Sequence, residues 1–319
     1  MAGIRAYMLG NDPQWEAVKE KAFHHNGWFI PEFIELAVSH IAHLLEPANL
    51  RQWLNEYDIP DTQASPRSIG VVMPGNLPLA GFYDLACIYL SGHRQRIKLS
   101  PKDNVLLKHL VTHPLKALDP TTASSISFED MLKGCDAYLA TDTGTLAPYL
   151  GKYAGILRKP QRRVALLTGD ESTAELELLA DDVFLYFGQG CMNVNKLLVP
   201  RDFDFIPLLK AFDKYRHLAD HNKYMNNYDY QLALLILNKE FYMTNGSILL
   251  SESAAATSPI ARLHYEYYDD EPPAVSGNHY RVAGKSLESR GYEALGEAGQ
   301  SVICEHKIGI DTLKFLLDL

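Results

Sequence analysis

Short apolar runs alternate with amphipathic segments over residues 68–152. A buried helix between two short strands is typical of a βαβ unit with a right-handed crossover. Repetition of this unit predicts a doubly wound parallel sheet, in which ligands bind beyond the carboxyl ends of the strands. The hydrophobic pattern predicts strands over 68–73, 96–99, 125–128 and 136–140, helices over 79–90, 104–111 and 129–133, and a helix start over 146–152.

A second α/β run begins near residue 162. Ser172 and Glu175 have capping-box spacing at the start of its first predicted helix. Residues 221–227 are polar and aromatic and are interpreted as a connector, and residues 268–278 as an acidic loop containing proline. The pattern predicts strands over 164–167, 196–199, 247–250 and 260–265, and helices over 172–187, 206–220 and 228–238.

The first 60 residues are predicted to be largely helical. Asp12-Pro13 has the form of an N-cap followed by a proline at the first helical position. A second helix is expected from about Pro31, with apolar residues at helical spacing. The expected organisation is therefore a helical segment over 1–60, α/β domains over 61–160 and 161–290, and a C-terminal segment over 291–319.

Composition and charge narrow the function classes. The 319 residues are 47% hydrophobic and 22% charged, which is an ordinary globular composition. A net charge of -9 argues against binding to nucleic acid or to an anionic membrane. No apolar run reaches about 18 residues, so no membrane-spanning segment is expected, and the N-terminus lacks a signal-peptide pattern.

The cysteines and histidines point to a cytoplasmic protein without a metal site. Cys87, Cys135, Cys191 and Cys304 are widely spread and form no C-x-x-C pair, as expected for free thiols in a reducing compartment. The 12 histidines show no ligand spacing such as H-E-x-x-H.

The turn Gly188-Gln189-Gly190-Cys191 is the main candidate for chemistry. Its two glycines allow close backbone approach to a bound group. If Cys191 begins a helical turn, unpaired amide groups and the helix dipole favour its thiolate, which makes it a candidate nucleophile. The alternative is a small buried residue at a tight turn, because free cysteine is among the most buried residue types.

Two further turns follow strands of the first α/β run. Asn76, in a Pro-Gly-Asn-x-Pro turn, is a candidate donor to a developing oxyanion, with an Asx-type turn as the alternative. Lys98 and Ser100 lie at a strand end, where they are candidates for binding a ribose hydroxyl or a phosphate, or are simply polar residues facing solvent.

Several standard catalytic patterns are missing from the sequence. G-x-G-x-x-G, a Walker A sequence and the G-x-S-x-G elbow are all absent, and no histidine lies in a pattern that pairs it with Cys191. A covalent cysteine without a histidine suits a leaving group that needs little acid assistance, such as a thiolate.

Taken together in chain order, these segments resemble the aldehyde dehydrogenase superfamily, and in particular its acyl-CoA reductase branch, which includes the bioluminescence fatty-acid reductases. The resemblance covers roughly residues 65–319. It is carried by Met73-Pro74-Gly75-Asn76-Leu77-Pro78, Ser91-Gly92-His93, Lys98-Leu99-Ser100, Phe187-Gly188-Gln189-Gly190-Cys191-x-Asn193-Val194, Asn226-Asn227-Tyr228-Asp229-Tyr230, Ser258-Pro259-Ile260 and Gly309-Ile310-Asp311-Thr312-Leu313.

The resemblance implies an α/β fold with two doubly wound, Rossmann-like lobes and an active site in the cleft between them. It implies that Cys191 is the nucleophile, that Asn76 is the oxyanion donor, and that Lys98, Ser100, Gly188 and Gln189 contact the cofactor. Residues 61–160 would then form the cofactor-binding domain and residues 161–290 the catalytic domain. A homodimer is also expected from the resemblance.

Two superfamily glutamates are missing. The segment that carries the hydrolytic base corresponds to Leu166-Leu167-Thr168-Gly169, with Glu171 close but out of register. The segment that holds the nicotinamide ribose corresponds to Ala256-Thr257-Ser258-Pro259, again without glutamate. The loss of the hydrolytic base suits an enzyme that does not hydrolyse its thioester.

The expected activity is therefore NADPH-dependent reduction of an acyl-CoA, or of an acyl-carrier thioester, to an aldehyde through a thioacyl-cysteine intermediate. Two alternatives remain open. One is a non-catalytic relative that binds acyl-CoA, and the other is an aldehyde dehydrogenase that works in the oxidising direction.

Overall fold

The computed structural model describes residues 1–141, 146–159, 162–269, 279–288, 292–299 and 310–319. The chain divides into two compact units, the first formed by Met1–Pro160 with Val302–Leu319 and the second by Gln161–Ser301. Most of the predicted acidic loop over 268–278 lies outside the described residues.

The N-terminal part of the first unit is helical, as the sequence predicts. Asp12 caps the second helix by accepting a hydrogen bond from the Gln14 amide at 2.8 Å, and Pro13 occupies the first helical position. The apolar stripe of the third helix is buried, with Phe33 and Ile41 fully inaccessible. The helices are α1 (Ala2–Leu9), α2 (Pro13–His25), α3 (Pro31–Leu44) and α4 (Pro47–Leu54).

A five-stranded parallel sheet forms the centre of the first unit. Its order is β3-β2-β1-β4-β5, so successive strands extend to either side of β1 and the sheet is doubly wound. Ile69, Val71, Ile97 and Leu139 on three of its strands are fully buried. The strands are β1 (Ser68–Val72), β2 (Arg94–Lys98), β3 (Ile126–Phe128), β4 (Ala137–Thr141) and β5 (Gly155–Arg158).

Short helical segments connect these strands. The nearly all-apolar run after β1 forms α5, which is buried over most of its length. The helices are α5 (Phe82–Leu90), α6 (Leu106–Leu110), a π-helical turn η1 (Val111–Leu115), α7 (Lys116–Leu118), α8 (Thr122–Ser125) and α9 (Ala147–Leu150).

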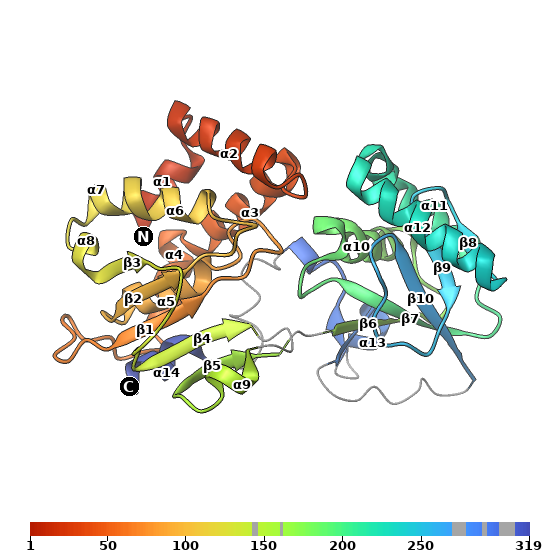
Figure 1. The fold of residues 1–319 in the computed structure, drawn as a ribbon. Coiled ribbons are helices and arrows are strands. Elements are labelled where there is room, and N and C mark those ends of the chain that lie inside the picture. The colour runs from red at the N-terminus through yellow and green to blue at the C-terminus, as the bar shows by residue number, and fades with distance from the viewer. Residues whose placement is uncertain (142–145, 160–161, 270–278, 289–291, 300–309) are drawn as a thin grey trace. The chain divides into compact units, whose positions relative to one another are not determined.

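The end of the chain returns to the first unit as helix α14 (Thr312–Leu317), drawn in dark blue among its strands in Figure 1. Buried Arg158 pairs with Asp84 of α5 at 2.7 and 2.9 Å and donates to the Thr312 hydroxyl at 2.7 Å. His93 also hydrogen-bonds the Leu316 carbonyl at 2.8 Å. These contacts tie α14 to β5 and to the region around α5.

The second unit contains a seven-stranded sheet in the order β12-β11-β6-β7-β10-β9-β8. All pairs are parallel except β8 with β9. Val164, Leu166, Leu198, Ala283 and Leu287 form a core cluster on this sheet. The strands are β6 (Arg162–Leu166), β7 (Val194–Pro200), β8 (Met243–Thr244), β9 (Leu249–Glu252), β10 (Arg262–Tyr268), β11 (His279–Ala283) and β12 (Glu293–Ala294).

The helices of the second unit begin with α10, whose capping box of Ser172 and Glu175 is confirmed, with the Glu175 amide 3.3 Å from the Ser172 hydroxyl. Figure 1 shows α10, α11 and α12 above the sheet. The helices are α10 (Thr173–Phe184), the 3-10 turn η2 (Leu185–Gly188), α11 (Phe205–Phe212), the 3-10 segment η3 (Asp213–Asp220), α12 (Asn222–Asn238) and α13 (Lys285–Glu288).

Two predicted elements are wrong. Residues 129–133 are not helical, and Glu129 instead pairs with Arg96 of β2 at 2.6 Å. Residues 222–227 are the first turns of α12 rather than a connector, and the His221 ring accepts a hydrogen bond from the Tyr224 amide at 3.3 Å as its cap. Asn222, Lys223 and Asn226 are exposed and only Tyr224 is buried, so this helical turn has the composition of a loop, which explains the error.

No helix in the described ranges is long and apolar enough to cross a membrane.

Candidate functional site

The turn that carries Cys191 has an unusual backbone. Helix α10 ends at Phe184, and Tyr186, Phe187 and Gly188 then adopt φ angles of 54°, 55° and 71°. A left-handed conformation costs about 1–2 kcal/mol for each non-glycine residue, so this run persists only where its surroundings fix it. Cys191 follows, half-buried, in the turn that leads into β7.

Aromatic and polar contacts hold the left-handed run in place. The buried Tyr186 hydroxyl donates to the Gly299 carbonyl at 3.2 Å. The Phe187 ring lies 4.8 Å from the ring of His221 and 5.6 Å from that of Tyr224, measured between centroids. The cap and first turn of α12 therefore support the backbone just before Cys191.

Asn193 clamps the turn from its other side. Its side-chain oxygen accepts a hydrogen bond from the Gly190 amide at 2.6 Å, and its amide group donates to the carbonyls of Asp182 and Leu185 at 2.8 and 3.0 Å. Asn193 is fully buried. One side chain thus joins the end of α10 to the residue before Cys191, and fixes where the cysteine stands.

The condition on which the sequence favoured a thiolate, that Cys191 begins a helical turn, is not met. The 3-10 turn η2 ends at Gly188 and β7 begins at Val194, so Cys191 lies in the turn between them and not at the start of a helix. A different source of thiolate stabilisation is required.

The expectation of four free thiols is also corrected. Cys87 and Cys135 are free and buried, whereas Cys191 is disulfide-bonded. The remaining cysteine of the sequence, Cys304, lies outside the described residues. A sulfur in a disulfide is not a nucleophile, so Cys191 must be reduced before it can attack a carbonyl.

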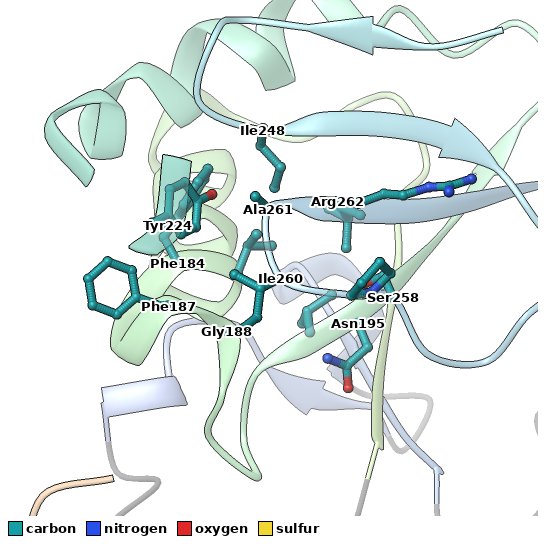
Figure 2. Close-up of a pocket in the computed structure, with 14 residues that line it drawn as sticks. Phe184, Phe187, Gly188, Asn195, Tyr224, Ile248, Ser258, Ile260, Ala261 and Arg262 are labelled. Carbon is teal, nitrogen blue, oxygen red and sulfur yellow. The ribbon is translucent and has the colours of Figure 1, made fainter. Parts of the chain in front are cut away.

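A cavity of about 60 Å³ lies beside this turn (Figure 2). Phe184, Phe187 and Gly188 line it from one segment, and residues 258–263 line it from another. The Gly188 turn and the Ser258-Pro259-Ile260 segment, which are 70 residues apart in sequence, therefore share one cavity. Ala261 on the second segment also has a left-handed backbone, with φ 63°.

Tyr224 of α12 lines the same cavity, and Figure 2 shows its hydroxyl directed toward Ile248 and Ala261. The side chain is 1% exposed, and its hydroxyl has no hydrogen-bond partner among the described residues. Burial raises the pKa of this phenol well above its usual value, so it remains a neutral donor.

Glu171 lies at the carboxyl end of β6, where the sequence lacks the expected hydrolytic base. Its Oε1 accepts hydrogen bonds from the Thr168 amide and hydroxyl at 2.6 and 2.9 Å, and its Oε2 accepts from the Gly169 amide at 3.0 Å. Both oxygens are engaged by the glutamate's own turn. This carboxylate therefore acts as a turn cap in the structure.

In the first unit, Asn76 is exposed in the turn after β1, and Lys98 is exposed at the carboxyl end of β2. The two segments pack together: the Met73 amide donates to the Lys98 carbonyl at 2.9 Å. A Cβ atom on Gly75 would lie 2.1 Å from the Ser100 hydroxyl oxygen, so the turn approaches Ser100 only because residue 75 is glycine. Asn76, Lys98 and Ser100 thus share one edge of the sheet.

The side chains of Asp103 and Asp182 are buried carboxyl groups that the sequence pattern does not indicate. Asp103 accepts a hydrogen bond from the Leu79 amide at 2.9 Å, and Asp182 accepts from the amides of Gly296 and Ala298 at 2.7 and 2.8 Å. Burial raises the pKa of each to about 7 against these backbone donors. A lone aspartate near a helix reads as an ordinary surface residue, so only the fold reveals them.

In the part of the chain that the structure describes, no group of three or more His, Cys, Asp or Glu side chains could hold a metal ion.

The fold is similar to that of solved aldehyde dehydrogenases. A benzaldehyde dehydrogenase from Corynebacterium glutamicum, described as NAD-dependent, shares 11% identity over 91% of this chain and 76% of its own, with a TM-score of 0.61. The indole-3-acetaldehyde dehydrogenase of P. syringae, solved with NAD+, shares 11% sequence identity over 92% of this chain and 73% of its own, with a TM-score of 0.63. Aldehyde dehydrogenase 21 from Physcomitrella patens shares 13% sequence identity over 85% of this chain and 69% of its own, with a TM-score of 0.57.

This chain has an aldehyde dehydrogenase-like α/β fold. No family model matches the sequence, and neither does any curated protein. At identities of 11–13% the likeness concerns the fold, which is the one expected from the sequence, with two parallel-rich sheets.

Proposed function

We propose that the protein reduces an acyl-CoA, or a related acyl thioester, to the aldehyde with NADPH. The observation that carries this proposal is the Cys191 turn, in which buried Asn193 and the left-handed run at Tyr186–Gly188 hold a cysteine at the start of β7. Such a fixed, half-exposed cysteine suits covalent catalysis, because attack on a carbonyl requires a nucleophile held in one geometry.

In the proposed reaction the reduced Cys191 thiolate attacks the thioester carbonyl carbon, and the Asn76 amide together with the Cys191 backbone N–H holds the oxyanion. Collapse of this adduct breaks the bond between carbon and the sulfur of coenzyme A. Coenzyme A leaves as a thiolate, and a thioacyl-enzyme remains. A thiolate leaves without proton transfer, which agrees with the lack of a histidine motif near Cys191.

The chemistry of the residues at the sheet edge fits a nicotinamide nucleotide. The Lys98 ammonium and the Ser100 hydroxyl lie where parallel strands end, and would hold the adenosine ribose or its phosphate, with Gly188 and Gln189 on the other unit. When bound, NADPH would supply a hydride to the carbonyl carbon of the thioacyl-enzyme and would become NADP+. The alkoxide so formed would collapse by breaking the bond between that carbon and the Cys191 sulfur, which releases the aldehyde and restores the Cys191 thiolate.

Glu171 supports reduction over hydrolysis. An oxidising aldehyde dehydrogenase needs a base that activates water against the thioacyl-enzyme, whereas both oxygens of Glu171 are engaged by the Thr168 and Gly169 turn. Without such a base the thioacyl-enzyme survives until the hydride arrives.

The covalent step is tested by mass spectrometry of the reduced protein mixed with acyl-CoA in the absence of NADPH. We expect the mass to increase by one acyl group in the wild type and to stay unchanged in Cys191→Ala. We expect Asn76→Ala to slow acyl transfer by about 10²–10³-fold, while Asn55→Ala, an exposed asparagine of the same unit, leaves it unchanged. A folded, reduced protein that takes up no acyl group would overturn the proposal.

The reductive step is tested by NADPH absorbance decay together with detection of the aldehyde. Lys98→Ala should raise the KM for NADPH more than that for NADH, whereas Lys102→Ala, a nearby exposed lysine, should leave both unchanged. Equal effects of the two substitutions would remove Lys98 from the cofactor site.

A non-catalytic acyl-CoA-binding role is a second candidate, and the disulfide at Cys191 favours it. Turnover after treatment with a reductant separates the two. Binding of acyl-CoA without acyl transfer by the fully reduced protein would support the binding role.

A further inference from the structure

The turn that carries Asn76 contains a strained residue. Leu79, three residues after Asn76, has a φ angle of 58°, in the left-handed region that leucine seldom adopts. Leu79 is fully buried. The backbone between Asn76 and α5 therefore keeps its course only because neighbouring groups fix it.

Asp103 is the side chain that fixes it. Its Oδ2 accepts a hydrogen bond from the Leu79 amide at 2.9 Å, and the carboxyl group is buried, with the residue 4% exposed. Asp103 lies 24 positions further along the chain, in the segment that precedes α6. A buried amide without this acceptor would be unsatisfied.

Asp103 also belongs to the cofactor edge of the sheet. Its own amide donates to the Ser100 carbonyl at 3.1 Å, and the Ser100 hydroxyl accepts from the Lys102 amide at 3.2 Å. Because Gly75 packs directly against Ser100, the loop that contains Asp103 contacts the Asn76 turn on both sides of Asn76.

We propose that Asp103 is a positioning residue whose buried carboxyl group sets the orientation of the turn that presents Asn76 to the reacting carbonyl. The inference rests on the proposed function for its catalytic consequence, because Asn76 is there the oxyanion donor. Its structural part, the hold on residues 74–80, is independent of any activity.

The protonation state of Asp103 gives the proposal a second signature. Burial raises its pKa to about 7, and the amides of Leu79 and Leu106 and the nearby charge of His25 on α2 lower it. His25 itself is hydrogen-bonded to the Pro101 carbonyl at 2.7 Å in the same loop. The Leu79 amide bonds more strongly to the ionised carboxylate than to the neutral acid. The hydrogen bond from Leu79 to Asp103 should therefore strengthen as pH rises through neutrality.

Three variants test the proposal. Asp103→Ala removes the acceptor, and Asp103→Asn retains an oxygen for the Leu79 amide but cannot titrate. Asp136→Ala is the matched control, because Asp136 likewise accepts a backbone amide hydrogen bond, from Ser68 at 2.7 Å, at the opposite end of β1.

The activity-independent measurement is amide hydrogen exchange over residues 74–80. We expect exchange in this segment to quicken by about tenfold or more in Asp103→Ala, as for loss of one buried hydrogen bond, and to stay near the wild-type rate in Asp103→Asn and Asp136→Ala. Unchanged exchange in Asp103→Ala would overturn the proposal. If that variant does not fold, Asp103→Asn still tests it, because wild-type exchange should slow between pH 6 and 8 while exchange in Asp103→Asn, corrected for intrinsic pH effects, should not.

The catalytic measurement is the rate of acyl transfer to Cys191. We expect Asp103→Ala to lower the maximal rate by about tenfold or more with little change in the dissociation constant of NADPH. Asp103→Asn should retain most of the rate and lose any inflection near pH 7. Equal rates in Asp103→Ala and the wild type would exclude a role in positioning Asn76, and a wild type that transfers no acyl group would refute the proposed function but not the hold on residues 74–80.

Discussion

The side-chain oxygen of Asn193 accepts a hydrogen bond from the Gly190 backbone amide at 2.6 Å, and this contact fixes the residue that precedes Cys191. The same side chain reaches back to two carbonyls at the end of α10. The position of Cys191 therefore depends on a buried amide two residues after it, rather than on a helix terminus.

Replacing Asn193 tests this dependence. Asn193→Ala removes the hydrogen-bond partner of the Gly190 amide, of the Asp182 carbonyl in a buried contact and of the Leu185 carbonyl in a partly buried one, and we expect it to lower the free energy of unfolding by about 2–4 kcal/mol. Urea denaturation measures the loss, and acyl transfer to Cys191 should slow in protein that remains folded. Asn49→Ala is the control, because half-buried Asn49 donates an exposed hydrogen bond to the His43 carbonyl at 2.9 Å, and its loss should cost less than about 1 kcal/mol. Equal losses in the two variants would contradict the role of Asn193.

Much of the architecture follows from the sequence because strands and helices of an α/β fold carry distinct apolar patterns. The strand at residues 68–73 and the capping box at Ser172 are visible as local signals, and the structure confirms both. The run at 221–227 misleads because Tyr224 is its one buried residue and the others are exposed or half-buried. Local composition does not separate that turn from a loop.

The candidate site is less predictable from the sequence than the fold. Asn76, Lys98 and Ser100 are found from their places at strand ends, and the structure brings their segments together through Gly75. The backbone of Tyr186 and Phe187 is left-handed although neither is glycine, which no local rule predicts. Asp103 acts across 24 residues on Leu79, so its role exists only in the folded chain.

The disulfide at Cys191 predicts that activity depends on the redox state. We expect protein isolated without a reductant to take up no acyl group, and treatment with dithiothreitol to restore transfer, because only a free thiolate attacks a carbonyl. Intact-mass measurement with and without the reductant checks this. Cys135→Ser is the control, since that thiol is free and buried. Full acyl transfer by unreduced protein would show that the disulfide does not block Cys191.

Because no described residue is hydrogen-bonded to the buried hydroxyl of Tyr224, we expect replacement of Tyr224 by phenylalanine to stabilise the protein. Burying a hydroxyl without a partner costs about 1–3 kcal/mol, so Tyr224→Phe should raise the free energy of unfolding by about 1 kcal/mol. Tyr228, on the same helix, is the matched control because its hydroxyl is hydrogen-bonded to that of Thr244 at 2.9 Å. Tyr228→Phe should lower stability by about 1 kcal/mol. Chemical denaturation measures the free energy of unfolding of both variants. If Tyr224→Phe lowers it as much as Tyr228→Phe does, the Tyr224 hydroxyl has a hydrogen-bond partner in solution.

The pKa values of Asp182 and His264 are shifted in opposite directions, so we expect the two residues to give opposite pH dependences of the free energy of unfolding. Burial raises the pKa of Asp182 to about 7 in the folded protein, against about 3.9 in the unfolded chain. Between these values the folded state keeps a proton that the unfolded state has lost. The stabilising contribution of Asp182 is therefore complete below about pH 4 and is lost as pH rises toward 7.

For His264 the direction is reversed. Burial, with the nearby charges of Arg262 and Lys196, lowers its pKa to about 4, against about 6.5 when unfolded. The unfolded chain then binds the extra proton, so stability gained from neutral His264 is present above about pH 6.5 and is lost as pH falls toward 4.

Two substitutions separate these contributions. The stability of the wild type relative to Asp182→Asn should fall by about 1 kcal/mol per pH unit between pH 4 and 7, and its stability relative to His264→Gln should rise over pH 4 to 6.5. Urea denaturation at several pH values measures both differences. Because each difference is taken against the same wild type, all other titrating groups cancel, and slopes of the same sign in the two comparisons would contradict the assigned environments.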